Sequence, residues 1–354
     1  MLAVSLLKKG SMLSTIFAGI AAFACSALGA LGVLPLLRSH GFIDDPRAAS
    51  RKVHARPIVL GGGIVIPLTL SAVLLVVAHT FPELMPALSI RKWLALAAAT
   101  LLLMIGGALD DKRQLPAPVQ LIAPTLASLL VVWSGIVVAR VTNPHGGVLE
   151  FGAVWWLPAV LTFVWLMAMM YGTKLLDGLD GLSTGLSAIG GLMIVAFTAT
   201  TRYYEPRIGF LAAIFAGACL GFLIYNFHPA RAFLGEGGSL FLGFFLGILA
   251  ILSGSKIATT LLVMGLPVFD VVRVMIVRAV TRQSIFRGDQ SHFHYLLLRS
   301  GLSHRAAVLS YYAVGFFAGL TALILQSTGK LIVLIGLLLC TLMTSIILEA
   351  RLRR

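Results

Sequence analysis

Residues 171–185, YGTKLLDGLDGLSTG, decide how the rest of the chain is interpreted. They lie between two apolar runs, 154–173 and 182–200, each close to the roughly 20 residues that cross a bilayer as a helix. The stretch contains two acidic residues, Asp177 and Asp180, each followed by glycine. Residues spaced in this way on a helix share one face, and acidic groups at membrane depth are costly and usually functional. We therefore expect the chemistry of the protein here.

The composition is that of a membrane protein. Of the 354 residues, 59% are hydrophobic and 11% are charged, and the mean hydropathy is +0.99, whereas soluble domains carry about 25% charged residues. Apolar runs long enough to span a bilayer recur along the whole chain. The sequence predicts one all-α integral membrane domain over residues 1–354, a polytopic bundle of about 10–11 transmembrane helices. A short external β-hairpin is expected within 136–152, turning at Asn143–Gly147.

The charge distribution predicts how the bundle is oriented. A net charge of +14 would suit a nucleic-acid partner, but most lysines and arginines fall in alternate loops, on one side of the bundle. The positive-inside rule makes that side cytoplasmic. Of the 13 acidic residues, all except Glu83, Glu150 and Glu205 lie on or near the same side. We therefore expect no nucleic-acid partner, a multi-pass protein of the cell inner (plasma) membrane, and one cytoplasmic active face.

Four further acidic residues lie at the edges of apolar runs or within them. Asp110 and Asp111 lie at the end of the third apolar run, 93–109, and adjacent carboxylates repel each other unless a cation such as Mg²⁺ is bound. A salt-bridged helix end would explain them equally well. Glu236 lies between two glycines, where it could bind a metal or simply favour a helix N-terminus. The spacing of Asp270 and Arg273 predicts an ion pair within the ninth apolar run, 257–278.

Basic and histidine-rich loops on the same side suit anionic ligands. Lys52 and His54 precede a glycine-rich helix entrance, which favours a phosphate or a lipid headgroup. The last loop carries Arg287, His292 and His294, which could hold phosphate or sugar hydroxyls. In both loops the alternative is a solvated basic segment that only anchors the topology.

Taken in order, these motifs carry a resemblance to a known family. They are RKVHARP (51–57), LDD (109–111), LDGLDGL (176–182), NFHPARAFLGEGGS (226–239) and DQSHFH (289–294). The motif-bearing region, about 38–305, resembles the polyprenyl-phosphate N-acetylhexosamine-1-phosphate transferase superfamily, glycosyl transferase family 4. Within it, the last loop is more similar to the undecaprenyl-phosphate N-acetylglucosamine-1-phosphate transferases than to the phospho-N-acetylmuramoyl-pentapeptide transferases.

The resemblance implies a reaction and roles for individual residues. An N-acetylhexosamine-1-phosphate would pass from a UDP-sugar to undecaprenyl or another polyprenyl phosphate. The products would be polyprenyl-diphospho-sugar and UMP, with Mg²⁺ or alternatively Mn²⁺ as cofactor. This step would initiate a cell-envelope glycan such as lipopolysaccharide or teichoic acid. Asp110, Asp111, Asp177 and Asp180 would be catalytic, Asp111 and Glu236 would bind the metal, and Lys52, His54, Lys174, Asn226, Arg287, His292 and His294 would bind substrate. Direct attack by the lipid phosphate is preferred, and a covalent aspartyl-phosphate route stays open.

Three positions depart from the family pattern. Tyr171 and Lys174 stand where the family usually has Asn-x-x-Asn, and Glu236 stands where it usually has Asp. Lys174 therefore puts a fixed cation in place of a neutral side chain. The departures leave the sugar and the metal dependence open. The alternatives are a phospho-N-acetylmuramoyl-pentapeptide transferase-like activity, a non-catalytic lipid-binding relative and a cation-coupled transporter. The chain is also a candidate homodimer.

Overall fold

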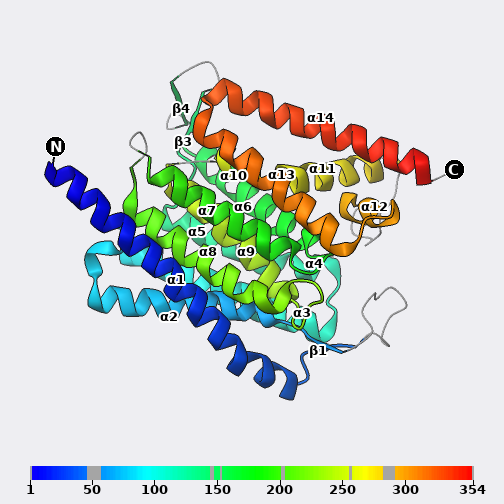
Figure 1. Cartoon of the computed structure of the whole chain (residues 1–354), viewed down its shortest axis with the longest axis horizontal. Helices are drawn as coiled ribbons and strands as arrows, with labels where there is room; N and C mark the ends of the chain where they lie inside the picture. The colour runs from blue at the N-terminus through cyan, green and yellow to red at the C-terminus, as the bar shows by residue number, and fades with distance from the viewer. Residues whose placement is uncertain are drawn as a thin grey trace.

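The computed structural model describes residues 2–45, 57–143, 147–151, 154–200, 204–254, 257–281 and 292–352. Over these residues the chain is a helical bundle with two small two-stranded sheets (Figure 1). Its helices are α1 (Leu2–Ser39), α2 (Val65–Thr80), α3 (Ile90–Arg113), α4 (Ala117–Gln120), α5 (Ile122–Ser134), α6 (Leu157–Leu176), α7 (Leu182–Thr198), α8 (Pro206–Asn226), α9 (Gly235–Leu252), α10 (Ile257–Val263), α11 (Gly265–Val280), α12 (Phe293–Arg299), α13 (His304–Ile324) and α14 (Ser327–Leu352), with short 3-10 helices η2 (Gly62–Ile64) and η3 (Pro82–Leu84).

The multi-pass membrane character is confirmed, and the expected number of spans is corrected. Within the described ranges, nine helices are long and apolar enough to cross a membrane, or ten if α10 and α11 count as one span. Of the expected spans, α7 has only 17 residues, and the one near 257–278 is bent by 81° between α10 and α11. Pro267 explains the break, because its ring cannot fit against the carbonyl four residues earlier. That carbonyl belongs to Val263, where α10 ends.

Helices α8 and α9 form the centre of the bundle. Over the most apolar 18 residues of each helix, 78% of the residues of α8 and 89% of those of α9 are buried, against 22% for α1 and 11% for α14. Helices α1 and α7 pack on α8, and α3 and α6 pack on α9. The outer helices expose apolar side chains, as a bundle in contact with lipid requires. The central position of α9 places its first turn, which carries Glu236, between α3 and α6.

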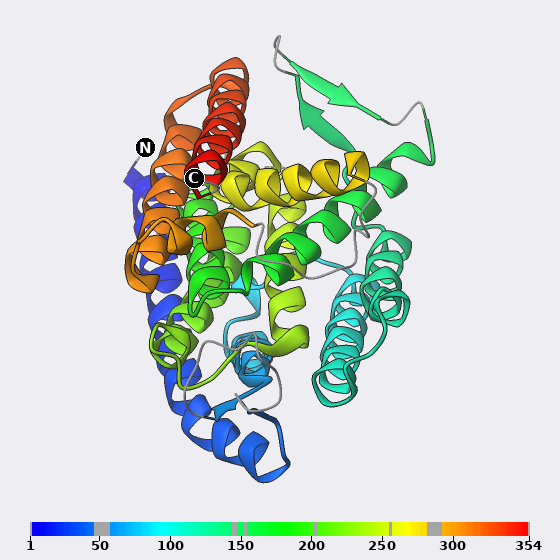
Figure 2. The ribbon, with the colours of Figure 1, turned by 90° about the vertical axis from the view of Figure 1, so that its right-hand side faces the viewer.

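The predicted hairpin is present, although which side of the membrane it faces stays a prediction. Strands β3 (Arg140–Thr142) and β4 (Val148–Glu150) pair antiparallel, and Arg140 lies opposite Glu150. The hairpin projects away from the helices (Figure 2). It lies near the end of the bundle that carries the amino terminus, opposite the end that carries β1, α4 and α12 (Figure 1).

A second small sheet ties the entrance of α2 to the loop between α8 and α9. Strand β1 (Ile43–Asp44) pairs with β2 (Ile58–Val59). The Phe233 N–H donates to the Val59 carbonyl at 2.8 Å, and the Gly62 N–H donates to the Phe233 carbonyl at 2.8 Å. Loops far apart in the sequence therefore meet at one end of the bundle, as the alternation of loops predicted.

Candidate active site

Asp111 lies in the last turn of α3 and contacts the first turn of α9. Its Oδ1 accepts a hydrogen bond from the Glu236 N–H at 3.0 Å. A helix N-terminus favours a carboxylate, because its free N–H groups and its dipole are positive there. Gly235 has a φ of +73°, and a side chain at this position would collide with Asp111 Oδ2 and with Gly61. Glycine therefore allows the carboxylate to approach the helix end.

Asp110 points in another direction. Its Oδ1 accepts hydrogen bonds from the Leu115 N–H at 2.7 Å and from the Gln120 side-chain amide at 3.2 Å. These contacts close the turn between α3 and α4. Asp110 stays a predicted catalytic residue, but the contacts it makes here fix the local backbone.

Lys174 connects α4, α6 and α9. Its Nζ forms an ion pair with Glu236 Oε1 and donates a hydrogen bond to Gln120 Oε1 at 2.8 Å. The Lys174 and Glu236 side chains are each 17% exposed. Lys174, predicted to bind substrate, therefore holds the carboxylate that was predicted to bind the metal.

Asp177 follows the last residue of α6, with its own N–H bonded to the Lys174 carbonyl at 3.2 Å. Burial raises the pKa of this carboxyl well above its usual range, and the negative charges of Glu236, Asp111 and Asp180 raise it further. Its neighbours thus come from α3, α9 and the turn that follows it. We call Asp110, Asp111, Asp177 and Glu236 the acidic cluster.

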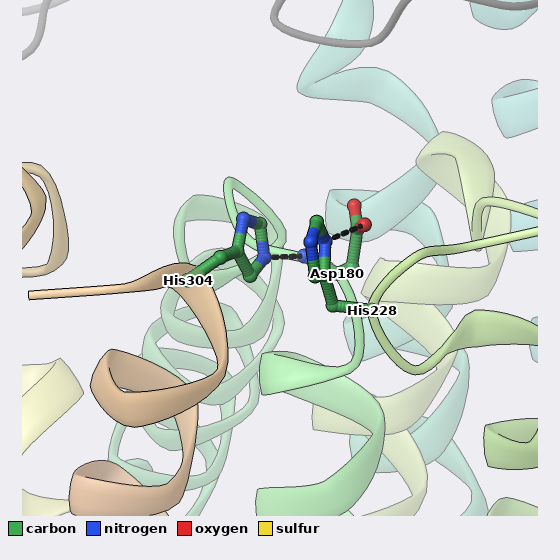
Figure 3. Close-up of side chains that lie close together, drawn as sticks. All are labelled: Asp180, His228 and His304. Atoms are coloured by element: carbon green, nitrogen blue, oxygen red, sulfur yellow. Dashed lines mark hydrogen bonds and ion pairs between the residues drawn. The ribbon is translucent and has the colours of Figure 1, made fainter.

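Asp180 links three segments, as Figure 3 shows. Its Oδ2 is 2.8 Å from His228 Nδ1 and accepts from the Ala230 N–H at 3.1 Å, while its own N–H donates to His304 Nε2 at 2.9 Å. The His228 and His304 rings stack with centroids 4.1 Å apart. One nitrogen of each ring and a carboxylate oxygen lie within 4.8 Å of one another. Because hydrogen bonds already use these atoms, the arrangement holds the Asp-Gly turn in place.

His292 and His294 connect the start of α12 to α11 and to the Asp-Gly turn. His292 Nδ1 lies 2.9 Å from Asp270 Oδ2, and Asp270 also accepts from Arg273 Nη2 at 3.0 Å, which confirms the predicted pair. His294 is 1% exposed, and its Nε2 faces Gly178 closely enough that any side chain there would displace it. Burial lowers the pKa of His294 to about 3, helped by His292. Its imidazole is therefore neutral at physiological pH.

The other predicted binding residues are less accessible or lie outside the described part of the chain. Asn226 is buried, accepts from Thr184 Oγ1 at 2.6 Å and donates to the Ala232 carbonyl at 3.0 Å. Its role in binding substrate stays a prediction. Lys52, His54 and Arg287 lie outside the described residues.

Sequence reasoning missed several residues that border the site. Gln120 contacts both Asp110 and Lys174, but it lies in the apolar run 117–139, for which the sequence predicts a membrane span. The Tyr295 hydroxyl lies against Gly178, and both burial and the charge of Asp177 raise the pKa of Tyr295. The missed residues are Gln120, His228, Tyr295 and His304. Two signals were available: the polar side chain of Gln120 within an apolar run, and the place of His228 within the motif 226–239.

Comparisons with known proteins agree with the motifs. The family model described as glycosyl transferase family 4 matches residues 93–254. The chain is 32% identical over 318 residues to a probable undecaprenyl-phosphate N-acetylglucosaminyl 1-phosphate transferase of Bacillus subtilis (strain 168), covering 87% of this chain and 85% of that protein. It is 28% identical over 324 residues to a decaprenyl-phosphate N-acetylglucosaminephosphotransferase of Mycolicibacterium smegmatis, covering 84% and 79%.

The pentapeptide branch matches a shorter part of the chain. A phospho-N-acetylmuramoyl-pentapeptide-transferase of Desulforudis audaxviator is 35% identical over 191 residues, which cover 52% of this chain and 53% of that protein. The matches to the N-acetylglucosamine relatives extend over most of the chain. That difference favours the N-acetylglucosamine branch, as the last loop predicted.

Proposed function

The chain belongs to glycosyl transferase family 4, whose relatives are phosphotransferases, and from this we propose its reaction. It transfers an N-acetylhexosamine-1-phosphate from a UDP-sugar to a polyprenyl phosphate, and releases UMP. The observation that carries the proposal is the acidic cluster, assembled from α3, α6 and α9 at one end of an apolar bundle. We place this end at the cytoplasmic face of the inner membrane, where the step would initiate a cell-envelope glycan.

The residues of the cluster fit a divalent cation. Asp111 and Asp177 offer carboxylate oxygens, the donors that Mg²⁺ prefers. Asp177 is surrounded by negative charge that opposes its ionisation, and a bound cation would relieve this repulsion. When bound, Mg²⁺ would neutralise charge between the two phosphate groups, which is a large part of catalysis in phosphoryl transfer.

The same environment favours direct attack by the lipid. An oxygen of the lipid phosphate forms a bond to the β-phosphorus of the donor, and the bond from that phosphorus to the bridging oxygen breaks, so that UMP leaves. A covalent route would need an ionised aspartate as nucleophile. Asp177 is assigned here to the cation, so its carboxylate would not be free to act as that nucleophile. Asp180, held by His228 and by the Ala230 N–H, keeps the turn that carries Asp177 in position.

The direct test measures UMP. Purified protein is incubated with undecaprenyl phosphate and a panel of UDP-sugars, with and without Mg²⁺ or Mn²⁺. We expect lipid-dependent UMP release with an N-acetylhexosamine donor, and the inclusion of UDP-N-acetylmuramoyl-pentapeptide tests the other branch. Asp177→Asn should reduce the rate by about 100-fold or more. Glu83→Gln removes a carboxylate from η3, outside the cluster, and should leave the rate unchanged. No UMP with any donor, or full activity of Asp177→Asn, would refute the proposal.

A further inference from the structure

One cation is already built into the acidic cluster. The Lys174 ammonium contacts the Glu236 carboxylate and the Gln120 carbonyl oxygen, and it lies 5.4 Å from the centroid of the Tyr171 ring. Each of these groups is negative or electron-rich towards the ammonium. Gln120 lies in α4, Glu236 in α9 and Tyr171 in α6, the helix of Lys174 itself. Partners from three helices therefore fix the position of the charge.

Glu236 contacts two neighbours through different groups. Its backbone N–H donates to Asp111, whereas its carboxylate is turned towards Lys174. An ammonium group offers three hydrogen-bond donors and no lone pair, so Lys174 cannot itself bind a metal. A divalent cation that approached the Glu236 carboxylate would meet the Lys174 ammonium beside it, and the two positive charges repel each other.

We propose that Lys174 is a resident cation of the acidic cluster, which keeps Glu236 out of the metal's coordination shell and leaves the divalent cation to Asp111 and Asp177. The inference rests on the proposed function, because that function requires the divalent cation. It assigns Lys174 a positioning role towards Glu236 and departs from the sequence-based prediction that Glu236 is a metal ligand.

The test measures metal binding without substrates. Purified protein in detergent is titrated with Mn²⁺ alone, and free Mn²⁺ is followed by electron paramagnetic resonance. In the natural chain, Glu236→Gln should change Mn²⁺ affinity by less than about threefold, because this carboxylate is not a ligand. Lys174→Met should raise the affinity roughly tenfold or more, the scale of changes next to metal ligands. Glu236→Gln added to Lys174→Met should abolish that gain.

Lys112→Met is the matched control. Lys112 follows Asp111 in the chain and is exposed, and its Nζ lies 4.4 Å from the centroid of the Phe42 ring. The substitution removes the same charge close to the cluster without touching Glu236. Its effect on Mn²⁺ affinity should stay below about threefold, because exposed charges are screened. An increase in Mn²⁺ affinity equal to that of Lys174→Met would show a general charge effect and overturn the inference.

Two other results would also overturn the inference. One is a roughly tenfold loss of Mn²⁺ affinity in the single variant Glu236→Gln, which would make this carboxylate a ligand. The other is an unchanged affinity in Lys174→Met. If that variant does not fold, Lys174→Gln replaces it, and Glu236→Gln in the natural chain still decides. UMP release by the natural chain separates the two proposals. Release with a failed Mn²⁺ pattern refutes only this inference, and the expected Mn²⁺ pattern without release refutes only the proposed reaction.

Discussion

Gly107 is where the packing of α3 on α9 can be tested against activity. Gly107 lies one turn before Asp111, and a Cβ built on it would collide with the backbone N and Cα of Gly237 and lie 3.0 Å from the Glu236 carbonyl carbon. The obstacle is backbone and cannot rotate away as a side chain can. Gly107→Ala must therefore move α3 away from the first turn of α9.

The expected cost is small in stability and large in activity. Overpacking costs roughly 1–3 kcal/mol, and alanine regains about 1 kcal/mol over glycine in a helix, so the thermal midpoint should fall by only a few degrees. A shift of about 1 Å would stretch the 3.0 Å hydrogen bond between Asp111 and the Glu236 N–H beyond bonding distance. Misplacement on this scale can cost about 100-fold in rate.

The assay is UMP release, with thermal unfolding in detergent measured on the same preparations. Gly32→Ala in α1 is the matched control, since nothing lies within 4 Å of a Cβ built there. It should keep full activity and gain up to about 1 kcal/mol from helix propensity. If Gly107→Ala releases UMP at the natural rate, close contact between α3 and α9 does not position Asp111, and the reasoning is wrong.

Three further changes test the surroundings of the site. Asp270→Asn removes one of the two carboxylates that pair with the buried Arg273, while Glu349 stays 2.7 Å from it. The change should cost roughly 1–3 kcal/mol, and an unchanged thermal midpoint contradicts this. His294 has a pKa of about 3 in the folded state against 6.5 ordinarily, so the unfolded chain binds more protons below pH 6.5. The contribution of His294 to the free energy of unfolding should therefore be full above pH 6.5 and fall by roughly 1.4 kcal/mol per pH unit as the pH drops towards 3. His294→Gln should flatten this pH dependence, and equal slopes in the two proteins would contradict the assignment. His228→Ala removes one hydrogen bond to Asp180 at a partly exposed site. The rate of UMP release should fall about tenfold, while the free energy of unfolding changes by less than about 1 kcal/mol. A change in the thermal midpoint without a change in rate would mean that the contact serves only the fold.

Hydropathy was enough to predict the bundle but not its break. The apolar character of 257–278 indicated one span, because an average over a window does not register a single missing N–H. Pro267 ends α10 at Val263 through a local steric effect, and α11 turns away by 81°. The gathering of loops at one end could be predicted, because successive spans return the chain to alternate ends of the bundle.

The acidic residues were found from the sequence because a carboxylate at the edge of an apolar run is conspicuous. Their partners were not, because these contacts join segments far apart in the chain. Gln120 and Lys174 are separated by 54 positions, and Asp180 and His304 by 124. No periodicity connects such pairs, so they follow only from tertiary contacts, here of the end of α4 with α6 and of α13 with the Asp-Gly turn.

Lys174 and Glu236 show why separate departures from a family pattern have to be interpreted together. From the sequence, one adds a cation and the other lengthens a carboxylate, and each alone puts metal binding in question. In the structure the two side chains form one ion pair across α6 and α9. A partly buried lysine without a partner, or another carboxylate beside Asp111 and Asp177 without a counter-charge, would each cost several kcal/mol. Together they leave the charge of the pair at zero. The two departures thus compensate each other, and single variants at either position should lower the thermal midpoint more than the double change does.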